Sequence, residues 1–172
     1  MRVIDRVISA VTGAGCEAVL VANDLVLFSE LGLRIRPDLH PGRGPLCGVE
    51  TALTWADEEG FDAAVIVGCD MPFLESGLLG DLIAHMARGR VVVPESRGPL
   101  GIEPLCALYG VSCLPAVEAQ LATGNPSMGR LVDTLPSTVI PLEEVARHGP
   151  PEQLFFNLNR IDQLATAEEF LS

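Results

Sequence analysis

Asp70 follows an apolar run in the stretch VIVGCDMPFL, which extends from Val65 to Leu74. The run predicts a buried strand, and the acid that ends it is held by the dipeptide Met71-Pro72. One interpretation is structural, because an Asp before a turn bonds its own backbone and a Pro begins the next helix. The other is a cation ligand, because Mg²⁺ binds through one or two carboxylates and leaves room for phosphate oxygens.

A second candidate is the Gly/Pro loop RGPLCG, from Arg43 to Gly48, which leads into a helix that starts near Leu46. Free backbone amides at a helix start can bind an anion, and Arg43 could contact a phosphate. An ordinary turn into a helix has the same composition, so the loop alone does not decide between the two.

The third candidate is FFNLN, from Phe155 to Asn159. Alternation in an extended segment places Asn157 and Asn159 on one face, where two amides can bind a metal's water, a phosphate or a base. Asn159 is also well placed to cap the helix that follows, so Asn157 is the more informative residue.

Composition limits what these residues can do. The chain has 172 residues, which suggests one domain, and its formal net charge of −12 argues against a nucleic-acid surface. No apolar run reaches the roughly 18 residues of a membrane span. The start MRVIDRVISAV does not have the pattern of a secretory signal, so we expect a cytoplasmic protein without a membrane partner. The five cysteines contain no CxxC pair, which favours reduced thiols over a zinc site.

The candidate site residues lie on a chain in which predicted strands and helices alternate. Apolar periodicity predicts strands over 17–22, 33–36, 61–68, 90–94, 105–109 and 138–141. It predicts helices over 2–12, 24–31, 49–58, 75–88, 111–123, 127–135 and 161–171. This order indicates an α/β fold with a mostly parallel sheet, in which ligands lie beyond the carboxyl ends of the strands. Asp70 is at such an end.

Four motifs in this order carry a resemblance: GPLCGVETAL, VIVGCDMPFL, EPLCALY and FFNLN. Together the sequence resembles the molybdenum cofactor guanylyltransferases, the MobA family, over essentially the whole chain. The resemblance implies a three-layer, Rossmann-like nucleotidyltransferase fold of the GT-A type. It implies transfer of GMP from GTP to molybdopterin with release of pyrophosphate, dependence on Mg²⁺, and contact with proteins that deliver or receive molybdopterin.

The resemblance also assigns roles to residues. Asp70 resembles the family's magnesium-binding acid, and Asn157 and Asn159 resemble its paired asparagines near the metal and the acceptor. Asp38 resembles an acid that recognises guanine, whose edge offers two N–H donors, and Asn23 is a weaker candidate for the same pocket. The remaining nucleotide-binding candidates are in the loop before the helix: Gly44, Pro45, Leu46 and Gly48.

One expected part has no counterpart. The family begins with a strand and a glycine-rich loop that holds the triphosphate, whereas this sequence starts inside the helix that should follow and contains no lysine. We therefore expect residues 1–172 to form a single nucleotidyltransferase-like domain that is N-terminally incomplete. The strands over 17–22 and 61–68 should then lack their shared neighbour. Glu103, where Gln is common, and Arg160-Ile161, where Thr-Pro is usual, are smaller departures.

Two other functions fit the same residues. A relative of the same fold that binds a pterin or a partner without catalysis would not bind GTP with Mg²⁺. A related cytidylyltransferase would use CTP as the donor in place of GTP.

Overall fold

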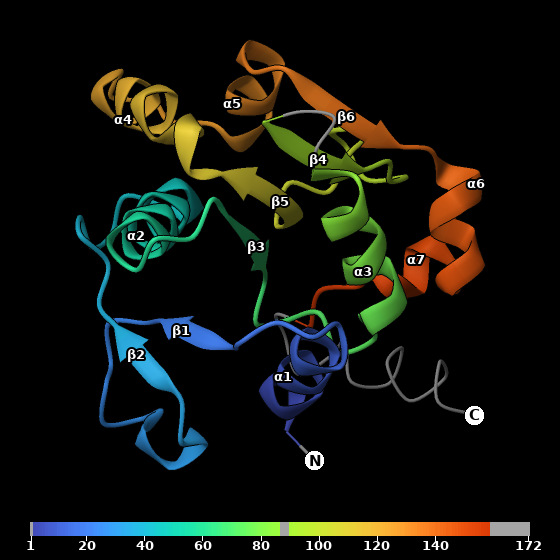
Figure 1. Ribbon diagram of the computed structural model, residues 1–172, viewed down its shortest axis with the longest axis horizontal. Coiled ribbons are helices and arrows are strands. Elements are labelled where there is room, and N and C mark those ends of the chain that lie inside the picture. The colour runs from blue at the N-terminus through green and yellow to red at the C-terminus, as the bar shows by residue number, and fades with distance from the viewer. Residues whose placement is uncertain (1, 87–89, 159–172) are drawn as a thin grey trace.

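The computed structural model describes residues 2–86 and 90–158 (Figure 1). Its helices and strands follow one another along the chain in the order α1 (Val3–Gly13), β1 (Val19–Val21), η1 (Ser29–Leu31), β2 (Arg34–Arg36), α2 (Pro45–Glu58), β3 (Ala63–Val67), α3 (Ser76–Ala84), β4 (Val91–Pro94), β5 (Cys106–Gly110), η3 (Val111–Cys113), α4 (Leu114–Ala122), α5 (Met128–Thr134), β6 (Ser137–Ile140), α6 (Leu142–Val145), η4 (Ala146–His148) and α7 (Pro151–Leu154). Within this part of the chain no helix is long and apolar enough to cross a membrane.

The main sheet has four strands in the order β3-β5-β4-β6. β4 and β6 are parallel, and β5 is antiparallel to both of its neighbours, so three of the four strands share one direction. The loop between β4 and β5 contains no helix and is closed by the bridge Glu95↔Ile102. A connection without a crossover helix returns the chain antiparallel, which explains the reversed strand in an otherwise parallel sheet.

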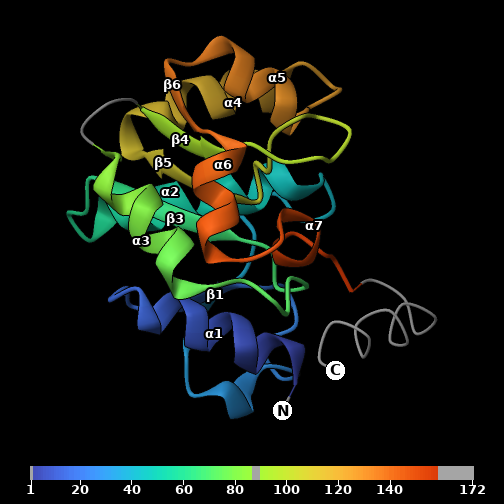
Figure 2. The same cartoon turned by 90° about the vertical axis from the view of Figure 1, so that its right-hand side faces the viewer.

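β1 and β2 form a separate parallel pair, with Leu20 opposite Ile35. This pair lies beside α1 at one end of the molecule, apart from the four-stranded sheet (Figures 1 and 2). Among the described residues, β1 pairs only with β2 and β3 only with β5, so these two strands have no shared neighbour there, as expected.

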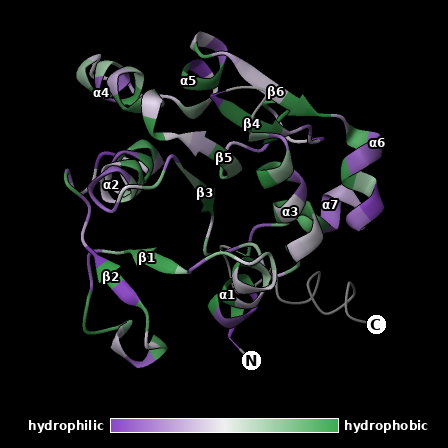
Figure 3. Cartoon of the chain, viewed as in Figure 1, coloured by the Kyte–Doolittle hydropathy of each residue, from purple (hydrophilic) through white to green (hydrophobic). Residues whose placement is uncertain are grey.

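Helices cover both faces of the main sheet and create two apolar cores. One core joins α2, α4 and α5 to the sheet through fully buried residues such as Leu53, Val117 and Leu131. The other joins α1, α3, α6 and α7 through residues such as Leu78 and Leu154. Figure 3 shows hydrophobic colour on β4 and on the inner sides of these helices. The predicted three-layer α/β fold is therefore correct.

Several boundaries differ from the sequence prediction. The helix expected over 24–31 is a turn followed by the short η1, although the Asp24 carboxylate accepts the Leu27 N–H three residues on, as an N-cap does. α2 starts at Pro45, earlier than the predicted 49, because Pro at the first helical position needs no N–H partner. The short helices α6 and α7 have no counterpart in the prediction. The helix expected over 161–171 lies outside the described residues.

Candidate active site

Asp70 lies three residues beyond β3, and its side chain folds back over the backbone of Gly68. A Cβ placed on Gly68 would be 2.7 Å from Asp70 Oδ1, closer than real Cβ atoms come, so the carboxylate keeps this position only over a glycine. The Asp70 carbonyl accepts the Leu158 N–H at 2.8 Å, which fixes the turn from a second direction. Among the described residues the Asp70 carboxylate has no ion-pair partner, so its charge is available to a ligand.

Asn157 precedes the residue that binds Asp70, which brings the FFNLN segment to the end of β3. Its Oδ1 is buried and has no hydrogen-bond partner within the described part of the chain. A buried amide oxygen without a partner costs free energy, which a ligand can recover. Asn159, the second asparagine of the predicted pair, lies outside the described residues.

Glu103 is a further acid near Asp70 that motif reasoning did not place in the site. The Leu105 carbonyl accepts the Gly68 N–H at 2.8 Å, so the segment before β5 lies against the Asp70 turn. Burial raises the pKa of Glu103, the Leu105 amide partly offsets this, and the Asp70 charge raises it further. Partial burial raises the pKa of the Cys69 thiol, and the same charge raises it further. The position of Glu103 in the EPL motif, just before a strand, is the signal that could have identified it.

Asn23 and Asp38 form a pair on the other side of the site. Asn23 Nδ2 donates to Asp38 Oδ2 at 2.9 Å, and the Asp38 N–H donates to Asn23 Oδ1 at 3.0 Å. The second carboxylate oxygen of Asp38 is buried and has no partner among the described residues. The two candidates for guanine recognition are therefore in direct contact, and one acceptor remains free for a ligand.

The start of α2 lies next to this pair. Gly44, the N-cap, has φ +86°, a conformation that strains residues with a side chain, and Pro45 and Leu46 form the first turn. Asp38 Oδ1 is 3.9 Å from the position of a Cβ on Gly48, so the free acceptor faces this turn. Arg43 does not point to the same place, because its Nη2 donates to the Leu121 carbonyl of α4 at 2.9 Å.

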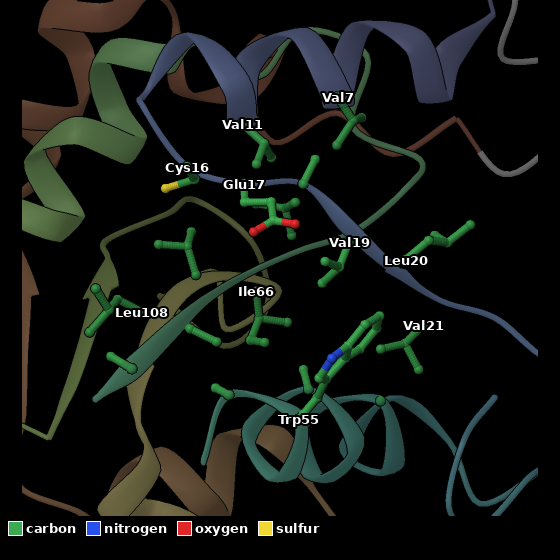
Figure 4. Close-up of a pocket in the computed structure, with 18 of the residues that line it drawn as sticks. Val7, Val11, Cys16, Glu17, Val19, Leu20, Val21, Trp55, Ile66 and Leu108 are labelled. Carbon is green, nitrogen blue, oxygen red and sulfur yellow. The ribbon is translucent and has the colours of Figure 1, made fainter. Parts of the chain in front are cut away.

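A cavity of about 720 Å³ lies between α1, β1, α2 and β3 (Figure 4). Its wall includes Pro45 and Gly48 from α2 and Gly68 and Cys69 from the turn before Asp70. Most of the rest of the wall is apolar and comes from α1, β1, α2 and β3, with the charged residues Glu17, Arg34, Glu59 and Asp62 also among the lining residues. The structure thus brings the Asn157-Leu158 segment to Asp70 and pairs Asn23 with Asp38 at the start of α2.

A divalent cation fits the Asp70 side of this arrangement. The Asp70 carboxylate without an ion pair and the buried Asn157 Oδ1 without a partner among the described residues, on segments joined by the Leu158-Asp70 backbone hydrogen bond, are the oxygen ligands that Mg²⁺ prefers. The described residues contain no cluster of three or more His, Cys, Asp or Glu side chains able to hold a metal by themselves. A cation here would therefore need water or ligand oxygens for most of its coordination, as is usual for Mg²⁺ bound with phosphates.

Comparison with known proteins gives consistent results. Residues 1–139 match the family described as MobA-like NTP transferase domain. A molybdenum cofactor guanylyltransferase from Desulfosudis oleivorans is 31% identical over 96% of this chain and 80% of its own length. One from Cereibacter sphaeroides is 33% identical over 90% of this chain and 74% of its own length.

Solved structures give the same fold. The molybdopterin-guanine dinucleotide biosynthesis protein A from Archaeoglobus fulgidus has a TM-score of 0.79 and 25% identity, covering 99% of this chain and 85% of its own. A 2-C-methyl-D-erythritol 4-phosphate cytidylyltransferase from Thermus thermophilus has a TM-score of 0.67 at 15% identity, over 98% of this chain and 88% of its own. At 15% identity, the similarity to the cytidylyltransferase supports a shared fold and not a shared function.

Proposed function

The chain belongs to the MobA-like NTP transferase family, and from this premise we propose that it is a guanylyltransferase that transfers GMP from GTP to molybdopterin. The observation that carries the proposal is the Asp70 carboxylate, which has no ion pair among the described residues and is held over Gly68 beyond the end of β3, on a turn that the Asn157-Leu158 segment contacts through its backbone. The substrates are inferred from the names of the relatives, and the role of each residue is inferred from its place in the site.

Asp38 is the guanine-recognising residue of this proposal. Its free Oδ1 accepts N–H groups from the guanine edge, while Asn23 holds the other oxygen and fixes the carboxylate plane. Gly44, Pro45, Leu46 and Gly48 let the nucleotide approach the start of α2 closely, because the turn presents backbone and no long side chains.

Asp70 and Asn157 would hold Mg²⁺, with Asn159 as a further candidate near the acceptor. When bound, the ion neutralises phosphate charge and aligns the reacting groups. In the reaction an oxygen of the molybdopterin phosphate attacks the α-phosphorus of GTP. The bond from that phosphorus to the bridging oxygen breaks and pyrophosphate leaves, so no covalent enzyme intermediate is needed.

The test is pyrophosphate release by the natural protein with molybdopterin, Mg²⁺ and either GTP or CTP. We expect release with GTP and little with CTP, and we expect Asp70→Ala to abolish both release and Mn²⁺ binding measured by electron paramagnetic resonance. Asp133→Ala, which removes an exposed acid of α5, is the matched control and should leave both unchanged. Equal use of CTP would favour a cytidylyltransferase, and no nucleotide binding would favour a non-catalytic pterin- or partner-binding protein.

A further inference from the structure

Asp38 lies in the segment that connects β2 to α2, and this segment runs against one face of that helix. A Cβ placed on Gly48 would be 3.9 Å from Asp38 Oδ1, and the Leu39 N–H donates to Thr51 Oγ1 at 3.0 Å. Gly48 and Thr51 are three residues apart in α2, so they lie on the same face. The helix therefore presents a glycine to the carboxylate and a hydroxyl to the amide that follows it.

The Thr51 side chain is fixed by the helix that carries it. Its hydroxyl donates to the Cys47 carbonyl one turn earlier at 2.9 Å, a bond that threonine commonly makes inside a helix. This bond uses the hydroxyl proton and leaves the oxygen lone pairs to accept the Leu39 N–H. Thr51 is 0% exposed, so solvent does not compete for that oxygen.

Asn23 holds Asp38 from the opposite side. The Asp38 N–H donates to Asn23 Oδ1 at 3.0 Å, and Asn23 Nδ2 donates to Asp38 Oδ2 at 2.9 Å. The peptide groups on both sides of the Asp38 Cα are thus fixed, one by Asn23 and the other by Thr51. Asp38 Oδ1 is the remaining acceptor, buried and without a partner among the described residues.

A neighbouring contact between the same segment and α2 is weaker. His40 Nε2 lies 3.7 Å from Glu50 Oε1, which is too long for a hydrogen bond, and the His40 side chain is 52% exposed. This contact therefore constrains the backbone less than the hydrogen bond from Leu39 to the buried hydroxyl of Thr51 does.

We propose that Thr51 is a positioning residue for guanine recognition, and that its hydroxyl sets the direction of the Asp38 carboxylate toward the start of α2. The inference rests on the proposed function, in which Asp38 Oδ1 accepts N–H groups of guanine. Thr51 acts through Asp38, because its buried hydroxyl is already bonded both as donor and as acceptor. A displaced carboxylate would lose the distance and angle that a hydrogen bond to the base requires.

The test is the preference for GTP over ITP, whose bases differ only in the 2-amino group of guanine. Competition binding gives the ratio of the two dissociation constants, in which contacts to the triphosphate and to the metal cancel. We expect Thr51→Val, which keeps the shape of the side chain but removes the hydroxyl, to lower this ratio about three- to tenfold. Thr51→Ala also lacks the hydroxyl and should lower it, whereas Thr51→Ser keeps the hydroxyl and should retain the preference.

Thr134→Val is the matched control. Thr134 Oγ1 donates to the Leu131 carbonyl of α5 at 2.8 Å, so this variant also removes a hydroxyl that is bonded to a helix carbonyl, but away from Asp38. We expect its ratio to equal that of the natural protein. Hydrogen exchange of the Leu39 amide, measured without nucleotide, should be faster in Thr51→Val than in Thr134→Val, because the acceptor of this amide is gone.

Three results would overturn the proposal. If Thr51→Val speeds exchange at Leu39 but keeps the natural ratio, Asp38 does not depend on Thr51, and the proposed function is unaffected. If Thr51→Ser lowers the ratio as much as Thr51→Val, the effect comes from packing and not from the hydroxyl. If the natural protein binds GTP and ITP equally, the proposed role of Asp38 fails, and the role of Thr51 fails with it.

Discussion

At the scale of single residues, the site depends on side chains that have been left without partners. Asp38 Oδ1 and Asn157 Oδ1 are buried acceptors with no donor among the described residues, and the Asp70 carboxylate has no ion pair there. Such groups cost stability in the free protein, and they are compensated only when a ligand supplies donors or a cation. The lack of a partner distinguishes these site residues from Glu17 and Glu59, whose carboxylates are both paired with Arg34.

The fit of Asp70 over Gly68 can be tested by adding one methyl group. Gly68→Ala places a Cβ where only 2.7 Å separates it from Asp70 Oδ1, so we expect the carboxylate to be displaced and Mn²⁺ affinity to fall about tenfold or more. Isothermal titration with Mn²⁺ and GTP measures the effect. Gly80→Ala is the control, because a Cβ there meets nothing within 4 Å. Unchanged affinity in Gly68→Ala would remove Asp70 from the metal site.

The proposed role of Asp38 makes a prediction about base discrimination. Guanine carries a 2-amino group that hypoxanthine lacks, so a carboxylate that accepts from this group should favour GTP over ITP. We expect Asp38→Asn to reduce that preference by about tenfold to a hundredfold, since hydrogen bonds to charged groups contribute roughly 1.5–3 kcal/mol. Competition binding of the two nucleotides gives the ratio. Asp133→Asn is the matched control, and an unaltered ratio in Asp38→Asn would place guanine elsewhere.

At the scale of elements, the edge of β3 has two non-equivalent sets of amides. Val65 directs its N–H to the cavity, whereas Ile66 directs its N–H to β5. Proline lacks this N–H and is tolerated only at strand edges. In the 172-residue chain we therefore expect Ile66→Pro to be more destabilising than Val65→Pro by about 1–3 kcal/mol, because it also leaves a buried carbonyl of β5 unpaired.

Thermal or urea unfolding of the two proline variants measures this difference. Both substitutions remove a β-branched apolar side chain from a half-buried position, so the side-chain losses are similar and the backbone direction is what differs. Equal destabilisation would contradict the antiparallel register of β3 with β5 and, with it, the assignment of free backbone groups to the cavity.

At the scale of the whole molecule, charge is the dominant unbalanced quantity. A formal net charge of −12 over 172 residues makes the compact state repel itself, and salt screens this repulsion. We expect the melting temperature to rise between about 10 mM and 300 mM NaCl, a range over which the Debye length falls from roughly 30 Å to below 8 Å. Calorimetry checks this, and the same series near pH 4.5, where the net charge is close to zero, should be nearly flat. A fall at neutral pH would mean that the surface ion pairs of Arg34 and Arg36 outweigh the repulsion.

Much of the fold follows from local patterns in the sequence. The apolar runs that become β3 and β4 and the amphipathic stretch that becomes α1 are readable without the structure, because periodicity is a local property. The position of Asp70 is determined in the same way, since a strand must end where its apolar run ends. The motif resemblance added Asn23, Asp38 and Asn157 as candidates, although it could not show how they meet.

Only the tertiary structure decided the rest, because these features depend on contacts between distant segments. It paired Asn23 with Asp38 across 15 residues of sequence, set Leu158 against Asp70, and brought Glu103 beside the same acid. It also reversed β5, which sequence periodicity cannot orient. The sequence determined that β3 is apolar enough to be a central strand, and only the packing revealed that one of its edges has no partner strand among the described residues, since hydrogen-bond partners are assigned by the sheet and not by the strand.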